Sequence, residues 1–262
     1  MPARHACLLG AMLYAFGFAM FAPHPVHAQA GAEIGAKTGA RVGVQAGPPS
    51  GASAVSPAET LLFETDHLAR VKAPAVLVYA FRKVSNVEPG FSDKVQLDLA
   101  KGNSRTRATL HFLSGANKHD IPTLEEAHGN PVLLGFLERD IAEMKRLTGG
   151  SAGYFRKRIR MALADEAQVS AQTITYQGKT LPAQAVRIQP YLNDPLHARF
   201  EQYVHKTYTF IVSEQVPGGV YQLRSSLANQ AGMVVARTGG AGAALPAIDE
   251  TLTLLSVTHS QR

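Results

Sequence analysis

The sequence predicts a β-rich α+β fold, in which an antiparallel sheet carries an inserted helical hairpin. Three observations lead to this prediction. Apolar and polar residues alternate with a period of two through most of the chain after residue 75. Short turns with the composition of β-hairpins connect these segments, which favours antiparallel pairing. One region, residues 130–165, instead has the spacing of two consecutive helices.

The first 28 residues have the pattern of a cleavable secretory signal peptide. Arg4 provides a short positive start, and residues 7–22 form an apolar run that is too short for an ordinary spanning helix. Val26-His27-Ala28 is a small-residue cleavage pattern, so the mature chain is expected to start at Gln29. Because the lone Cys7 lies in the leader, the mature chain would contain no cysteine.

The leader comprises residues 1–28, and two further segments follow it. Residues 29–58 are mostly Gly, Ala, Pro and Ser, which predicts a disordered linker. Residues 59–262 are long enough for a single globular domain. No later stretch is apolar enough to span a membrane, so we expect a periplasmic protein without a transmembrane segment after processing.

Composition narrows the expected partners. Hydrophobic residues make up 45% of the chain and charged residues 18%, as in ordinary globular proteins. The net charge of +6 is mildly basic, and export argues against a nucleic-acid partner. An anionic envelope partner would fit this charge, while a solvated surface with a modest basic excess is the alternative.

Period-two alternation predicts most of the strands. The segment 76–81 is apolar on both faces and is expected to be central in the sheet. Pro89-Gly90, Gln177-Gly178-Lys179 and Pro217-Gly218-Gly219 have the composition of turns. The expected strands are 76–81, 94–99, 107–112, 169–176, 183–189, 208–212, 220–225, 233–237 and 250–258.

The helical hairpin has recognisable ends. Asn130 is a good N-cap and Pro131 suits the first helical position, while Gly149-Gly150 ends the first helix. Ser151 can cap the second helix, which is expected to reach Asp165. A shorter helix is expected over residues 195–205.

Two charged residues fall inside the apolar arcs of this hairpin. Asp140 lies in the arc of the first helix and Arg158 in that of the second, when residues are placed at about 100° steps. Two unpaired buried charges would be unfavourable, and arginine can bind a carboxylate through two hydrogen bonds. We therefore predict that Asp140 and Arg158 form a structural ion pair across the hairpin.

Residues 149–153 match the G-x-S-x-G pattern of serine hydrolases. That pattern requires a strand before the serine, whereas here a helix precedes Ser151. The glycines and Ser151 are explained as helix caps, and a nucleophilic Ser151 is the alternative.

A loop before the first helix contains His119, Asp120, Glu125, Glu126 and His128, residue types that can bind metals. They have no spacing typical of a metal site, and we predict neither a metal nor a cofactor.

Basic residues gather around the second helix. Arg156, Lys157 and Arg160 share the face opposite its apolar arc, so this face is the candidate for contact with anions. A solvated outer helix face is the alternative.

The element order from Ala75 to Thr258, together with the segments 129–134 (GNPVLL) and 154–159 (YFRKRI), resembles periplasmic half-barrel proteins. These include the lipoprotein-localisation carriers and related uncharacterised exported domains. The resemblance implies a curved, half-barrel-like sheet whose concave face, covered by helices, holds an acyl chain or stays closed. The residues that would line this pocket are Tyr79, Phe81, Leu97, Phe112 and Phe210. An ordinary packed core is the alternative.

The function predicted from the sequence is the binding or trafficking of an apolar or amphipathic envelope ligand, a lipid or a lipoprotein, without catalysis. A structural or adaptor protein of the envelope is one alternative, and a serine hydrolase that uses Ser151 is another. The identity of the ligand and the oligomeric state do not follow from the sequence.

Overall fold

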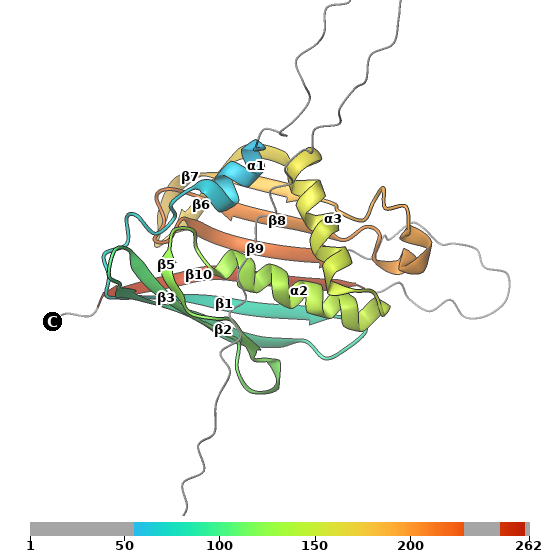
Figure 1. Cartoon of the computed structure of the whole chain (residues 1–262), viewed down its shortest axis with the longest axis horizontal. Coiled ribbons are helices and arrows are strands. Elements are labelled where there is room, and N and C mark those ends of the chain that lie inside the picture. Colours follow the sequence, from blue (N-terminus) through green and yellow to red (C-terminus); the bar gives the residue numbers. More distant parts are fainter. Residues whose placement is uncertain (1–54, 228–246, 260–262) are drawn as a thin grey trace, which may run out of the picture. The chain divides into compact units, whose positions relative to one another are not determined.

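The computed structural model describes residues 55–227 and 247–259. These residues form an open antiparallel sheet of ten strands with three helices on one face (Figure 1). The strand order is β4-β3-β2-β1-β10-β9-β8-β7-β6, and β5 pairs with β3 as well. The predicted fold class, a curved antiparallel sheet with an inserted helical hairpin, is confirmed. The predicted leader and the expected strand at 233–237 lie outside the described residues.

The strands are longer than the sequence pattern indicated, and two short ones were not predicted. β4 and β5 both pair with β3, in the segment that was expected to be a loop. The strands are β1 (Ala75–Ser85), β2 (Phe91–Lys101), β3 (Thr106–Phe112), β4 (His119–Asp120), β5 (Leu124–Ala127), β6 (Gln168–Tyr176), β7 (Lys179–Ile188), β8 (Thr207–Val212), β9 (Val220–Leu227) and β10 (Ile248–His259).

The helices are α1 (Pro57–Glu59), α2 (Val132–Thr148) and α3 (Ala152–Asp165). A π-helical turn, Thr60–Glu64, continues α1. Pro57 and Ala58 were expected to be part of the linker, but they lie in α1, where Ala58 is buried. The helix expected over 195–205 is instead a loop with two 3-10 turns, His197–Arg199 and Glu201–Tyr203. Asp194 accounts for this difference, because its carboxylate and carbonyl accept the amides of Leu196 and His197 and hold the chain in a turn.

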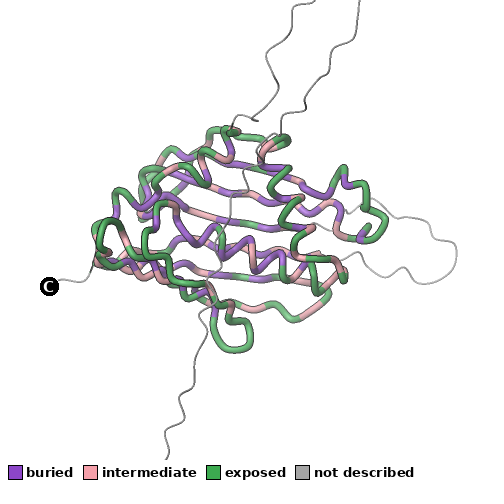
Figure 2. The backbone as a smooth tube through the Cα atoms, viewed as in Figure 1, coloured by how far each residue is buried: buried purple, intermediate pink, exposed green. Residues whose placement is uncertain are grey.

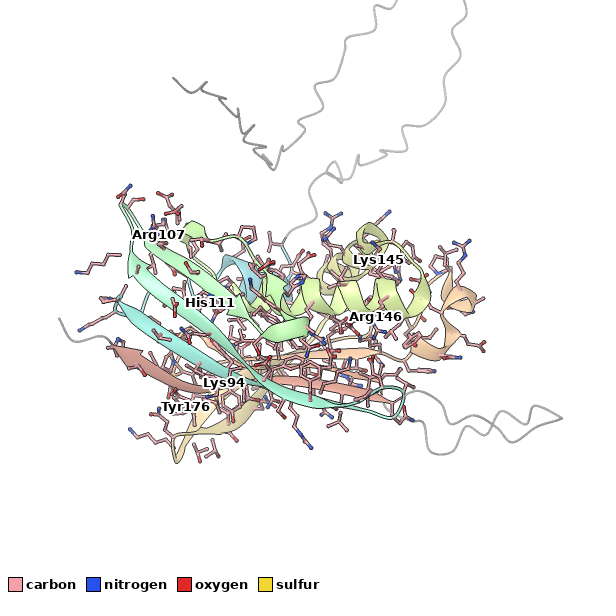
Figure 3. All side chains as sticks on the ribbon, turned by 90° about the horizontal axis from the view of Figure 1, so that it is seen from below. Lys94, Arg107, His111, Lys145, Arg146 and Tyr176 are labelled. Atoms are coloured by element: carbon pink, nitrogen blue, oxygen red, sulfur yellow. The ribbon has the colours of Figure 1, made fainter. Side chains whose placement is uncertain are left out.

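The alternation of buried and exposed residues along β1 explains how the sheet forms two layers with the helices. Leu77, Tyr79 and Phe81 are fully buried, whereas Arg82 and Val84 are exposed. Figure 2 shows buried and less buried positions following one another along the strands. The buried set points to the face that the helices cover, here called the covered face. Figure 3 shows the sheet below and the helices above. The core therefore lies between these two layers.

The helical hairpin has the predicted caps. The Asn130 side chain accepts the amide of Val132, and Gly149 ends α2 in the left-handed conformation with a φ of 71°. Ser151 caps α3 by accepting the amide of Tyr154. Gly135 lets α2 approach the sheet, since a Cβ atom there would lie 2.7 Å from Leu110.

Candidate functional site

The candidate site is the interface between α2 and the covered face, and its first half is apolar. Leu133, Phe136 and Leu137 of α2 are buried in the same cluster as the residues that the sequence predicted to line a pocket. Tyr79, Phe81, Leu97, Phe112 and Phe210 are each at most 1% exposed. The structure thus brings the five predicted lining residues into one packed core, which their own side chains and those of α2 fill.

Two surface hollows lie elsewhere. One, of about 310 Å³, follows the ends of β1 and β2 and includes Arg82 and Phe91. The other, of about 250 Å³, lies beside the loop before β9 and includes Glu214 and Pro217. The predicted pocket residues line neither hollow.

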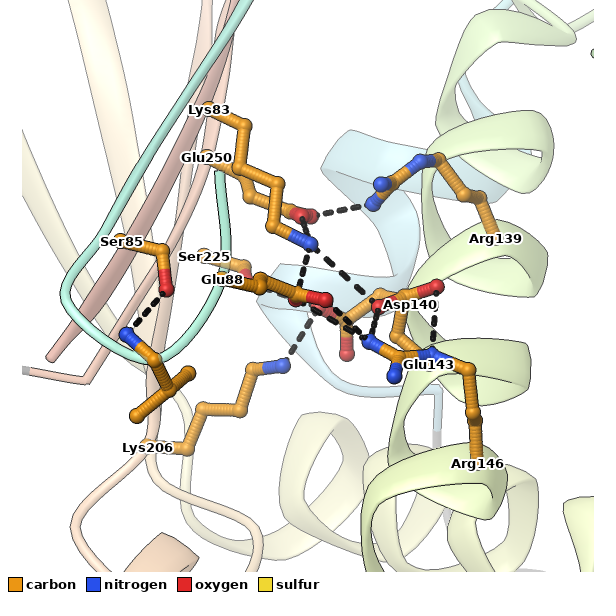
Figure 4. A network of polar contacts seen from close by, with 11 residues as sticks. Lys83, Ser85, Glu88, Arg139, Asp140, Glu143, Arg146, Lys206, Ser225 and Glu250 are labelled. Carbon is orange, nitrogen blue, oxygen red and sulfur yellow. Dashed lines mark hydrogen bonds and ion pairs between the residues drawn. The ribbon is translucent and has the colours of Figure 1, made fainter. Parts of the chain in front are cut away.

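The second half of the interface is charged. Six residues form it, here called the charged cluster: Lys83, Glu88, Arg139, Glu143, Arg146 and Glu250 (Figure 4). Lys83 Nζ lies 2.6 Å from Glu88 Oε1, 3.4 Å from Glu143 Oε2 and 3.3 Å from Glu250 Oε1. The Lys83 and Glu250 side chains are only 5% and 3% exposed. Positive and negative groups are equal in number, so the cluster is neutral as a unit.

Burial of Lys83 would by itself lower its pKa. The hydrogen bond to Glu88 and the charges of Glu250 and Glu143 outweigh this effect, so the pKa of Lys83 is raised. Burial would by itself raise the pKa of Glu143. The hydrogen bond from Arg146 and the charges of Lys83 and Arg139 outweigh this effect, so the pKa of Glu143 is lowered. The charged forms are therefore the stable ones inside this interface.

Arg139 joins the apolar and charged halves. Its guanidinium bonds Glu250 of β10 and lies 4.8 Å from the ring centroid of Phe81 on β1. A cation above an aromatic face is attracted by the ring. Arg139 consequently holds α2 against the two strands at the middle of the sheet.

A second polar group surrounds Asp140. Its carboxylate accepts hydrogen bonds from Ser225 Oγ at 2.7 Å and Tyr208 OH at 2.5 Å, and it lies 2.6 Å from Lys206 Nζ. Tyr208 OH also lies 3.2 Å from Tyr191 OH. These five residues, here called the Asp140 cluster, are all buried. Burial and the Asp140 charge raise the pKa of Tyr208 well above its ordinary value, so the phenol keeps its proton and donates it.

The predicted ion pair between Asp140 and Arg158 does not form. Asp140 pairs with Lys206, whereas Arg158 Nε lies 2.9 Å from Asp194 Oδ2 and the guanidinium also donates to the Pro190 carbonyl. Both charges do lie in the buried arcs, as predicted, but Asp140 faces Tyr208 of β8 and Ser225 of β9, while Arg158 faces the loop after β7. Each charge therefore meets a different neighbour.

Sequence reasoning missed most of the charged partners. Lys206 and Asp194 lie next to or within a loop, where no periodicity indicates burial. Lys83 and Glu250 carry a signal that could have been read. Lys83 continues the inward series of β1, and Glu250 lies between the buried residues Ile248 and Leu252 of β10.

The N-terminus of α2 is fixed at the opposite end of the interface. Asn130 Nδ2 donates to Tyr79 OH and to the Gly218 carbonyl, each at 2.8 Å. The backbone amide of Asn130 donates to His67 Nδ1 at 3.3 Å, while His67 Nε2 donates to the Leu61 carbonyl at 2.9 Å. This arrangement explains the GNPVLL segment as the anchor of α2.

The basic face of α3 is exposed, as its pattern predicted. Arg156 is not a free cation, because it binds Glu138 of α2 through two hydrogen bonds of 2.8 and 2.6 Å. Lys157 and Arg160 are exposed and have no ion pair within the part of the chain that the structure describes. The candidate anion surface is thus reduced to these two residues.

Ser151 does not have the geometry of a hydrolase nucleophile. The chain enters it from α2 and Gly150 rather than from a strand, and its hydroxyl accepts the Tyr154 amide at 3.2 Å. A nucleophile elbow needs a strand-to-helix turn that exposes the hydroxyl. The hydrolase alternative has no support from this geometry.

The acidic and histidine residues before α2 are separated by their own partners. Glu125 bonds Arg107, Glu126 bonds Ser104, and Asp120 pairs with Lys118. Within residues 55–227 and 247–259, no group of three or more histidine, cysteine or acidic residues is placed to hold a metal ion.

Together these observations define the class of fold. It is an open antiparallel sheet with one face covered by a helical hairpin, and the hairpin contacts this face through one apolar and one charged region. The part of the chain that the structure describes has no helix long and apolar enough to cross a membrane.

Comparison with solved structures finds a weak resemblance to folds of the lipoprotein-localisation-carrier type. The lipoprotein LppX of Mycobacterium tuberculosis is 10% identical, with a TM-score of 0.28 over 69% of this chain and 85% of that one. A LolA superfamily protein of Nitrosomonas europaea is 8% identical, with a TM-score of 0.21 over 78% of this chain and 94% of that one. No protein-family model and no curated protein matches the sequence.

Proposed function

We propose that this protein is exported through its N-terminal leader and binds an amphipathic envelope ligand, a lipid or the acyl group of a lipoprotein, between α2 and the sheet. Because the interface is filled when closed, binding requires α2 and α3 to move away from the covered face. The protein would thus act as a carrier or binding protein rather than as an enzyme.

The observation that carries this proposal is the charged half of the α2 interface. Separating apolar surfaces in water is unfavourable by about 25 cal/mol per Å². Arg139 and Glu143 of the charged cluster, in contrast, regain hydration when α2 moves, as does Asp140 of the Asp140 cluster, and this offsets the loss of their ion pairs. A helix held in this way separates from the sheet at a lower free-energy cost than an entirely apolar helix of the same length.

The two halves of the interface also match the two parts of an amphipathic ligand. An acyl chain that replaces α2 over Phe81 and Phe112 would gain about 0.8 kcal/mol per buried CH₂ group. Lys83 and Glu250, the members of the charged cluster that belong to the strands, would then lie beside the polar head. Lys157 and Arg160, exposed on α3, would attract anionic heads from solution.

The absence of tryptophan from the chain allows a direct test. Phe112→Trp places a single tryptophan, which can be excited separately from the tyrosines, on the covered face, where Phe112 is fully buried. Titration with a dibrominated stearic acid should quench this fluorescence and reach saturation, because bromine quenches only at short range. The matched control is Phe63→Trp on the turn after α1, where the side chain is 37% exposed and outside the α2 interface.

Quenching in the Phe112→Trp variant without quenching in the Phe63→Trp variant is the expected result. Equal quenching in both variants, or none in Phe112→Trp, would contradict an acyl site under α2 and favour the adaptor alternative. Phe81→Trp, at 1% exposure on the neighbouring side of the same core, reports on the same site if Phe112→Trp does not fold.

Export is tested separately. We expect the protein to be recovered from the periplasmic fraction with Gln29 as its first residue. An uncleaved chain in the cytoplasmic fraction would contradict the proposed localisation.

A further inference from the structure

The two edges of the sheet differ in how they are covered. At one edge, β3 is paired with the short strands β4 and β5. At the other edge, β6 pairs with β7 alone, and it ends at Tyr176 at the margin of the sheet (Figure 3). Although α1 contacts β6, the described residues provide no backbone hydrogen bond to its outer side. β6 therefore presents an open strand edge.

The turn after β6 determines which of its backbone groups point outward. Gln177 and Gly178 both have positive φ angles, of 49° and 76°, and Tyr176 pairs with Lys179 across this two-residue turn. In such a hairpin the residues that flank the turn exchange hydrogen bonds with each other. The backbone groups of every second residue from Thr175 backward consequently face away from β7.

Not all of that edge is free. The Thr175 carbonyl accepts a hydrogen bond from Tyr221 OH at 3.1 Å. The outward groups of Val169, Ala171 and Thr173 have no such partner within the described residues. The free edge is thus the stretch 169–173.

This stretch lacks the features that normally protect an edge strand. Proteins place charges, prolines or bulges on exposed edges to prevent pairing with other chains. β6 contains no charged residue and no proline, and its register with β7 is continuous. Its first four residues are exposed on both faces, and Val169 is 38% exposed.

We propose that β6 is a dimerisation edge, on which β6 of a second copy of this chain adds as an antiparallel strand centred on Ala171. In this register Ala171 lies opposite Ala171 of the second copy, and Val169 lies opposite its Thr173. The two strands exchange about six backbone hydrogen bonds through the outward groups of residues 169–173. The proposal does not depend on the proposed ligand.

The lack of charge in β6 favours a second copy over a different partner. A strand that pairs with itself about a two-fold axis places identical residues near one another, so any charge near its centre would repel itself. β6 avoids this repulsion along its whole length. A partner of opposite charge would instead be matched by charged residues on the edge, and β6 has none.

The test introduces the missing charge. Ala171 is exposed, so Ala171→Lys and Ala171→Glu should leave the fold intact while placing like charges opposite one another. Sedimentation of the full mature protein should show a dimer for the wild type. Dimerisation of each single variant should be weakened by at least roughly fivefold. An equimolar mixture of the two variants should recover the dimer, since lysine then faces glutamate.

Ala100→Lys is the matched control, because Ala100 is exposed on β2, which is paired on both sides. It should dimerise like the wild type. A wild type that stays monomeric, a dimer that both Ala171 variants preserve, or a mixture that stays monomeric would each overturn the proposal. Thermal unfolding of every variant verifies that it is folded.

Discussion

Asp140 on α2 and Lys206, just before β8, form an ion pair that is almost fully removed from solvent. Asp140 Oδ1 and Lys206 Nζ are 2.6 Å apart, and the two side chains are 1% and 4% exposed. Tyr208 and Ser225 complete the hydrogen bonds of the carboxylate. The pair and these bonds hold α2 to β8 and β9, strands that lie far from it in the chain.

We expect Asp140→Ala to be strongly destabilising, because it leaves Lys206 buried without a counter-charge. Loss of one partner of a buried pair typically lowers the free energy of unfolding by about 3–5 kcal/mol. Chemical denaturation measures this change. Arg156→Ala, which breaks the exposed pair with Glu138, is the control and should lower stability by about 1 kcal/mol or less. Equal losses in the two variants would show that the Asp140 pair is not specially buried.

Gly135→Ala should destabilise the protein although alanine favours helix formation. The added Cβ atom would lie 2.7 Å from Leu110 Cδ2 and 2.8 Å from Phe112 Cδ2. Overpacking of this kind typically lowers stability by about 1–3 kcal/mol, against a helix-propensity gain of about 1 kcal/mol. Gly153→Ala on α3 is the control, since nothing beyond its chain neighbours and the backbone of its own helix lies within 4 Å of its Cβ position, and it should raise the melting temperature. An increase in stability for both variants would contradict close contact between α2 and β3.

Acidification should lower the free energy of unfolding through protonation of His67. Burial lowers the pKa of His67, although the bond to the Leu61 carbonyl and the Asp66 charge act in the opposite direction. The unfolded chain therefore binds a proton at His67 more readily than the folded one, and the stability contributed by neutral His67 is lost as the pH falls below its ordinary value of 6.5. Protonation at Nδ1 would also break the hydrogen bond from the Asn130 amide.

Denaturation between neutral and mildly acidic pH measures this effect in the wild type and in His67→Gln. The variant should be less stable at neutral pH and show a shallower loss on acidification. An unchanged slope would mean that other groups cause the pH dependence.

Ser151→Ala should affect stability and nothing else. Removing an N-cap hydroxyl lowers helix stability by about 1 kcal/mol. Ser151→Asp should retain most of the stabilisation by the cap, because aspartate also caps helices. Thermal unfolding checks both variants. Thr148→Ala removes another hydroxyl at the α2–α3 connection and is the control. The hydrolase alternative would be restored if the wild type had an esterase activity that Thr148→Ala kept and Ser151→Ala lost.

The sequence by itself determined the local structure, because alternation, caps and turns depend on neighbouring residues. Period-two patterns located the main strands, and Asn130, Gly149 and Ser151 marked the ends of the two long helices. Asp140 was correctly placed on a buried arc, and the predicted pocket residues all face the same core. Two short strands were missed, since two to four residues that pair at an edge carry almost no periodic signal.

Which residues meet across the fold was decided by the tertiary structure. β1 pairs with β10, which brings Lys83 opposite Glu250, and no local pattern relates two strands so distant in the chain. In the same way, the order of the strands brings Tyr208 of β8 and Ser225 of β9 to Asp140 of α2 and leaves β6 at the edge. Periodicity specifies which face of an element is buried, but the partner on that face depends on the arrangement of distant segments. For that reason Asp140 was predicted to be buried and paired, and its partner, Lys206, could be identified only from the fold.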